Sequence, residues 1–214
     1  MNQTDAMARA ARAKKVTWVG FWVNVVLSVA KIIAGIVGRS GAMIADGVHS
    51  ISDFVTDIIV IVFIGVSAKG ENTRFRYGHG KFETFATMLI SFALFAVAVG
   101  LFWTSFSQIV DALNGKVLPR PEMVALVMAF VSVVAKEWLF HYTRVAGEQM
   151  NSMALVANAW HHRSDAFSSI AVLVGIGCAM FLGERWRVLD PIAAATVSVF
   201  IALVAYRLAM PSIR

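Results

Sequence analysis

Residues 153–182 of this 214-residue chain read MALVANAWHHRSDAFSSIAVLVGIGCAMFL. The segment is long and apolar enough to form a membrane-spanning helix, which needs about 20 residues at a rise of about 1.5 Å each. Its first half nevertheless contains His161, His162, Arg163 and Asp165. Ionisable groups cost free energy in the core of a bilayer. A spanning helix that keeps four of them is expected to use them.

Five other segments share this apolar character. They are Val16–Gly38, Ala42–Ala68, Phe82–Val110, Met123–Tyr142 and Val188–Leu208. Only 15% of the residues in the chain are charged, whereas soluble proteins carry about 25%. A soluble enzyme, a nucleic-acid binder and a disordered chain are therefore poor interpretations. Because the segments are continuously apolar and not alternating, we predict an all-α membrane protein with six transmembrane helices and no β-barrel.

Basic residues between the segments indicate the orientation, since loops on the cytoplasmic side are enriched in Lys and Arg. If the N-terminus is inside, most of the loop residues of this kind fall on the inner side, among them Lys69, Arg76 and Lys81. We predict that both the N-terminus and the C-terminus are cytoplasmic. Residues 1–15 would form a cytoplasmic segment and residues 16–210 the six-helix transmembrane domain, with no C-terminal cytoplasmic domain in this chain.

Two His/Asp pairs occupy the second and fifth segments. His49 and Asp53 are four residues apart and share a helix face, and His161 and Asp165 do the same. Counted along two helices that run in opposite directions, both pairs lie roughly 10–18 Å deep. Two imidazoles and two carboxylates suit a tetrahedral divalent cation, with zinc favoured. The sequence thus predicts a metal site at His49, Asp53, His161 and Asp165 near the middle of the bilayer.

Polar residues around this site admit more than one interpretation. Asp46 and Asp57 either extend the polar face of the second helix as a path for cations or are solvated carboxylates near its ends. His162 points about 100° away from His161, which suggests a supporting or interfacial position, and Asn158 is a supporting donor or an interhelical hydrogen-bonding group.

Two further interpretations concern the basic residues inside spans. The charged groups of the second and fifth segments could simply hold helices together by pairing with one another or with Lys31 and Arg163. Lys136, which we place towards the inner end of the fourth helix, is interpreted as a snorkelling side chain.

Three motifs resemble those of the cation diffusion facilitator family. They are AMIADGVHSISD at residues 42–53, RYGHGK at residues 76–81 and NAWHHRSD at residues 158–165. Members of this family are proton-coupled exporters of divalent metals and usually act as homodimers. The resemblance implies that His49, Asp53, His161 and Asp165 form the transport site, in the version associated with zinc and often cadmium.

This chain also departs from the family pattern. Some members bind a second metal in the loop before the third helix through a carboxylate and two histidines, whereas here only His79 is present and Asn72 and Phe75 stand at the other positions. A loop site at His79 is therefore expected to be absent or weak. Many members continue into a cytoplasmic domain, but this chain stops at Arg214. The absence of a His-rich loop between the fourth and fifth helices favours a bacterial inner-membrane protein.

The sequence therefore predicts a secondary transporter and not an enzyme, because HExxH, GxSxG and phosphate-binding glycine loops are all missing. We expect a multi-pass exporter that exchanges Zn²⁺ for protons, with Cd²⁺, Fe²⁺ or Mn²⁺ as further cargoes and no prosthetic cofactor. Its expected partners are the lipid bilayer and a second copy of the chain, and no nucleic acid. Two alternatives are an iron or manganese exporter of the same family and a membrane metal sensor that binds without transport.

Overall fold

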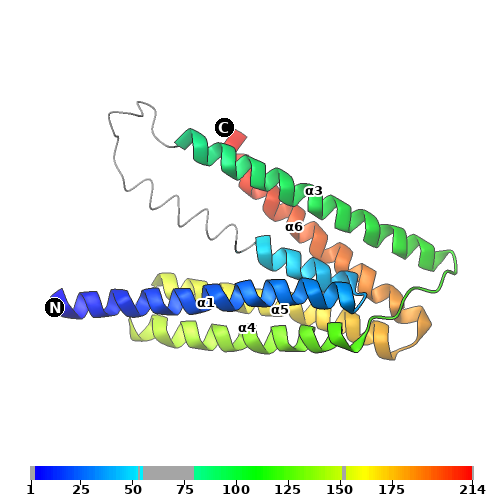
Figure 1. The fold of residues 1–214 in the computed structure, drawn as a ribbon, viewed down its shortest axis with the longest axis horizontal. Coiled ribbons are helices and arrows are strands. Elements are labelled where there is room, and N and C mark those ends of the chain that lie inside the picture. The colour runs from blue at the N-terminus through cyan, green and yellow to red at the C-terminus, as the bar shows by residue number, and fades with distance from the viewer. Residues whose placement is uncertain (1–2, 53, 55–79, 151–152, 214) are drawn as a thin grey trace.

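The computed structural model describes residues 3–52, 54, 80–150 and 153–213, and all regular structure among them is helical (Figure 1). The elements are α1 (Gln3–Val37), α3 (Gly80–Leu113), α4 (Met123–Gln149), α5 (Met153–Phe181), the short 3-10 helix η1 (Glu184–Val188) and α6 (Leu189–Ile213). Residues 41–52 are also helical and follow α1 through a tight turn.

Five helices of the described part of the chain are long and apolar enough to cross a membrane. Their spans are Lys15–Val37, Ser91–Leu113, Met123–Gln149, Asn158–Phe181 and Glu184–Arg207. Only the first part of the predicted second segment, residues 41–52, is described, and it is helical. The prediction of an all-α membrane protein is confirmed. The N-terminal end of α1 and the C-terminal end of α6 lie at the same end of the bundle (Figure 1), although the side of the membrane that this end faces stays a prediction.

Several helices are longer than the apolar segments that predicted them. α1 begins at Gln3 and not at Val16, because the intervening Ala, Arg and Lys residues are good helix formers. α4 continues past Tyr142 to Gln149, since no proline interrupts this stretch. The hydropathy pattern marks the length of helix that suits the hydrocarbon layer, while the helix itself ends only where capping or a chain breaker stops it.

The helices form two groups that meet at the end opposite the termini. α4 packs against α1 and α5, and α3 packs against α6. Figure 1 shows the α3–α6 pair diverging from the other helices towards the terminal end of the bundle. Where the groups meet, the buried core is rich in small side chains, including Ala34, Ala45, Ala98, Ala129 and Ala194. Small residues let helix backbones approach closely, as they do in other membrane bundles.

Two glycines bring the helix at residues 41–52 into direct contact with α1. A Cβ atom added at Gly47 would lie 2.7 Å from Cγ1 of Ile32, and one added at Gly35 would lie 2.7 Å from the backbone nitrogen of Ile44. Only a residue without a side chain fits such spaces. This close approach places Asp46 next to Lys31, with consequences for the site described below.

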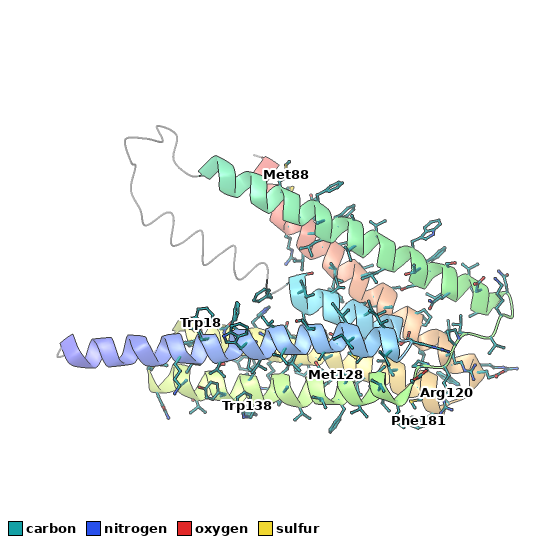
Figure 2. The ribbon with its side chains drawn as sticks, viewed as in Figure 1. Trp18, Met88, Arg120, Met128, Trp138 and Phe181 are labelled. Atoms are coloured by element: carbon teal, nitrogen blue, oxygen red, sulfur yellow. The ribbon has the colours of Figure 1, made fainter. Side chains whose placement is uncertain are left out.

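Large apolar side chains cover the outside of the bundle. Trp18, Trp138 and Phe181 point away from it in Figure 2, and each is exposed. A soluble monomer would rarely expose so much apolar surface. The hydrocarbon layer of a membrane is the natural environment for these side chains.

Candidate functional site

The predicted ligands lie on two helices, and the structure describes three of them. His161 and Asp165 are one turn apart on α5, with 3.9 Å between Nε2 and Oδ2. His49 is half-buried on the helix at residues 41–52. Asp53 lies outside the described residues, as do Asp57 and His79. Among the described residues no group of three or more His, Cys, Asp and Glu side chains is placed to hold a metal, so the four-ligand site stays a prediction.

Besides His161, Asp165 has a neighbouring lysine that the sequence did not indicate. The Nζ atom of Lys136 on α4 lies 3.8 Å from Oδ2 of Asp165. This distance is short enough for an ion pair but too long for a hydrogen bond. Both side chains are buried, so the pair is enclosed within the bundle.

The snorkelling interpretation of Lys136 is therefore wrong. The prediction ended the fourth helix at Tyr142 and so placed Lys136 near its inner end. Because α4 continues to Gln149, Lys136 lies midway along it, and only 2% of its surface is exposed. A lysine in the middle of a spanning helix is too deep to reach the interface. With the fourth helix extended to Gln149, the central position of Lys136 in the sequence would have indicated that its side chain is buried.

His162 lies at the interface between α5 and α1. Its ring is buried, and its Nε2 atom is 3.4 Å from Nδ2 of Asn158. On the α1 side the ring faces Gly20, where an added Cβ atom would lie 3.7 Å from Nε2. His161, by contrast, has a side chain that is 43% exposed. The two adjacent histidines thus have different surroundings: His162 is interfacial, and a supporting role at the metal site stays a prediction.

Asp46 is held in a buried network of polar groups. Its Oδ2 atom lies 2.7 Å from Nζ of Lys31, and neither side chain is exposed. Nζ of Lys31 also donates to the hydroxyl oxygens of Ser50 at 3.1 Å and Ser169 at 3.3 Å. Ser169 in turn donates to the carboxylate of Asp46 at 3.2 Å. The interpretation of Asp46 as a solvated carboxylate is wrong, while a place on a cation path stays a prediction.

Arg163 is not part of either ion pair. Its guanidinium carbon lies 4.7 Å from the centre of the Phe140 ring and 5.4 Å from that of Trp160. Cation–π contacts of this kind stabilise a cation against an aromatic face. Of the two basic residues that the sequence suggested as helix-pairing partners, only Lys31 contacts a carboxylate in the described part of the chain.

Asp190, a carboxylate that the sequence motifs did not indicate, fixes the start of the helix at residues 41–52. Asp190, in the first turn of α6, accepts hydrogen bonds from the hydroxyl of Ser40 and from the backbone N–H of Gly41, the latter at 2.8 Å. Ser40 also accepts from the N–H of Met43 at 3.1 Å. Together they cap the helix and place a negative charge at its positive end. The helix that carries His49 is thereby anchored to α6.

Comparison with known proteins identifies the family. Residues 17–214 match the family model of the cation efflux transmembrane domain. This chain belongs to the cation diffusion facilitator family. The match covers nearly the whole chain, and it agrees with the resemblance that the three sequence motifs indicated.

Several relatives are about one-third identical to this cation diffusion facilitator. Magnetosome protein MamB of Magnetospira sp. (strain QH-2) is 32% identical over 210 residues, which cover 98% of this chain and 69% of MamB. The manganese efflux system protein MneP of Bacillus subtilis is 33% identical over 212 residues, covering 97% of this chain and 70% of MneP. Mitochondrial metal transporter 1 of Saccharomyces cerevisiae is 33% identical over 207 residues, covering 86% of this chain and 39% of that protein.

The chain spans only part of the length of many relatives. It covers between 39% and 53% of the fungal and plant proteins that it matches. Family membership and the helices together establish a multi-pass membrane protein of a metal-transporting family.

Proposed function

We propose that this chain is the membrane domain of a divalent-metal exporter whose metal binds at His49, Asp53, His161 and Asp165. The observation that carries the proposal is the position of Asp165, a buried carboxylate in a spanning helix with an imidazole one turn away. Such groups are rare in spans and usually line the path of an ion. The cell membrane is the expected location, with the termini on the cytoplasmic side.

The packing of the two ligand-bearing helices supports this site. The helix at residues 41–52 runs antiparallel to α5 (Figure 1) and contacts it through the hydrogen bonds between Asp46 and Ser169. In antiparallel helices, a step forward on one corresponds to a step back on the other. His49 follows Asp46 by one turn, and Asp165 precedes Ser169 by one turn. The register therefore favours a site in which the His49 turn lies beside the Asp165 turn.

The ligand types favour zinc as the cargo. Two imidazole nitrogens suit zinc better than manganese, which prefers oxygen ligands. Manganese or iron is the alternative, because a relative that is 33% identical to this chain is named as a manganese efflux system protein. In each case the metal is a transported substrate and not a resident cofactor.

Exchange for protons follows from the chemistry of these ligands. A bound metal requires neutral imidazoles and ionised carboxylates, so metal binding displaces protons and protonation displaces the metal. A site that opens alternately to the two sides of the membrane would then carry metal outward and protons inward. A homodimer is the expected assembly.

Flux measurements in proteoliposomes test this proposal. Purified protein is reconstituted with a metal-sensitive and a pH-sensitive dye inside the vesicles, and Zn²⁺, Mn²⁺, Fe²⁺ and Cd²⁺ are added in turn. We expect zinc flux with proton counterflow in the wild type and none in Asp165→Asn. Asp111→Asn, which changes an exposed carboxylate at the end of α3, is the matched control and should transport normally. Tight metal binding without any flux would instead favour the sensor alternative.

A further inference from the structure

Lys136 carries a buried positive charge, and its ammonium group makes no hydrogen bond to the residues that the structure describes. It lies midway along α4 and is almost fully buried. Its Nζ atom has no hydrogen-bond partner among the described residues, and its ion pair with Asp165 is 3.8 Å long. A buried ammonium group without hydrogen bonds is costly to keep. The presence of a lysine at this position is therefore better explained by function than by stability.

The same bundle satisfies another buried lysine completely. Lys31 reaches Asp46 at 2.7 Å, Ser50 at 3.1 Å and Ser169 at 3.3 Å. Asp165 and Ser169 are four residues apart on α5, which is about 6 Å along the helix. The Lys136–Asp165 pair, called the loose pair below, thus lies one turn along α5 from the Lys31–Asp46 network, which contains the tight pair. Lys136 is held mainly by its charge, so its flexible side chain can leave Asp165 without breaking a hydrogen bond.

Among the described residues of this region, two buried lysines face two buried carboxylates. Lys31 and Lys136 lie within electrostatic range of both Asp46 and Asp165. A divalent cation that approached Asp165 would meet a neutralised carboxylate and a nearby ammonium group that repels it. One of the two lysines must give way. Lys31 is fixed by three contacts, which leaves Lys136.

We propose that Lys136 is a tethered counter-cation of the transport site. Its ammonium group neutralises Asp165 when the site holds no metal, and it withdraws from that carboxylate when a divalent cation takes its place. This inference rests on the proposed function, because it takes Asp165 as a metal ligand. By competing for Asp165, Lys136 weakens metal binding and speeds metal release, so that the cargo does not remain trapped in the membrane.

Substitution of Lys136 by a neutral residue of similar length tests this role. Zinc and manganese binding to Lys136→Met would be measured by calorimetry at pH 8, where protons compete least with the metal, and flux would be measured in proteoliposomes. We expect the affinity to rise about ten- to hundredfold, because the competing charge is removed, and the maximal flux to fall. Lys136→Arg, which keeps the charge, should bind metal with nearly wild-type affinity.

Lys116→Met is the matched control, since Lys116 lies just beyond the end of α3 and forms an exposed ion pair with Asp111, and it should change neither quantity. A folded Lys136→Met with unchanged or weaker metal binding would overturn the proposal. Lys136→Gln takes its place if the Met variant does not purify as a single species. Failure of both neutral variants to fold, while Lys136→Arg folds, would assign the charge to stability and also overturn it. If the wild-type protein neither binds nor transports metal, that result would instead count against the proposed function.

Discussion

Two buried lysines contact α5 at positions one helical turn apart, Lys31 at Ser169 and Lys136 at Asp165, and differ in how they are held. Lys31 contacts a carboxylate and two hydroxyl groups, whereas Lys136 makes one ion pair with the described residues, to Asp165 at 3.8 Å. The Lys31 network joins α1, the helix at residues 41–52 and α5, so we expect it to stabilise the bundle. Fully satisfied buried networks make a structure rigid, and partly satisfied ones are costly. The difference distinguishes a structural ion pair, Lys31–Asp46, from a pair whose partners can separate, Lys136–Asp165.

The largest effect is expected for the carboxylate of the loose pair. Asp165→Ala should abolish metal flux in proteoliposomes, because it removes a proposed ligand, while the protein still inserts in the membrane. Insertion should survive because alanine removes a costly charged group from the span. Wild-type flux from this variant, measured beside Asp111→Ala, would rule out Asp165 as a ligand.

Breaking the tight pair should mainly affect stability. Lys31→Met leaves Asp46 as an unpaired buried charge, and loss of one partner of such a pair costs about 3–5 kcal/mol. Thermal unfolding in detergent, followed by size-exclusion chromatography, should show a large loss relative to Lys116→Met. The double variant Lys31→Met/Asp46→Asn should recover much of this loss, since no unpaired charge remains. A Lys31→Met protein as stable as the wild type would remove the distinction between the two lysines.

Acidification should weaken zinc binding at the proposed metal site. Zinc affinity should fall by about tenfold or more between pH 7 and pH 6, because imidazole ligands must be neutral to bind the metal and histidine titrates in this range. Calorimetry in buffers of different ionisation enthalpy would count the protons released. If zinc binding in the wild type released no protons, histidine ligation would be excluded.

The smallest effect is expected for a hydroxyl group in the tight network. Ser169→Ala removes one partner from Lys31 and one from Asp46 but leaves their direct contact in place. We expect a loss of about 1–3 kcal/mol in the free energy of unfolding and little change in metal affinity. Ser107→Ala, an exposed serine of α3, is a suitable control. A change in affinity as large as that of a ligand variant would connect the two networks.

The sequence predicted the spans and the α5 pair because both depend on local spacing. Apolar length identified the helices, and the four-residue interval placed His161 and Asp165 on one face, where the structure has them. The position of Lys136 was misjudged because apolar residues end at Tyr142, whereas the helix does not. Hydropathy reports the environment of side chains, but helix length depends on capping and on chain breakers.

The partners of the buried charges were harder to predict, because they depend on how helices pack. Lys31 was one of two basic residues suggested to pair with a carboxylate, and the spacing alone could not choose between it and Arg163. The choice follows from Gly47, which lets the backbone of residues 41–52 reach that of α1 beside Ile32. The contact of Asp190 with Ser40 links residues 150 positions apart, and no periodicity within one helix signals it.

The glycine contacts between α1 and residues 41–52 also determine which parts of the molecule can move separately. At Gly35 and Gly47 the two backbones are packed without clearance, and the buried Lys31–Asp46 pair joins them next to Gly47. Neither helix can slide along the other, so the two should turn as one rigid lever. Cross-linking α1 to residues 41–52 should consequently leave flux unchanged. The reorientation that delivers a bound metal across the membrane must then occur at the other surfaces of this lever, and His49 travels with α1.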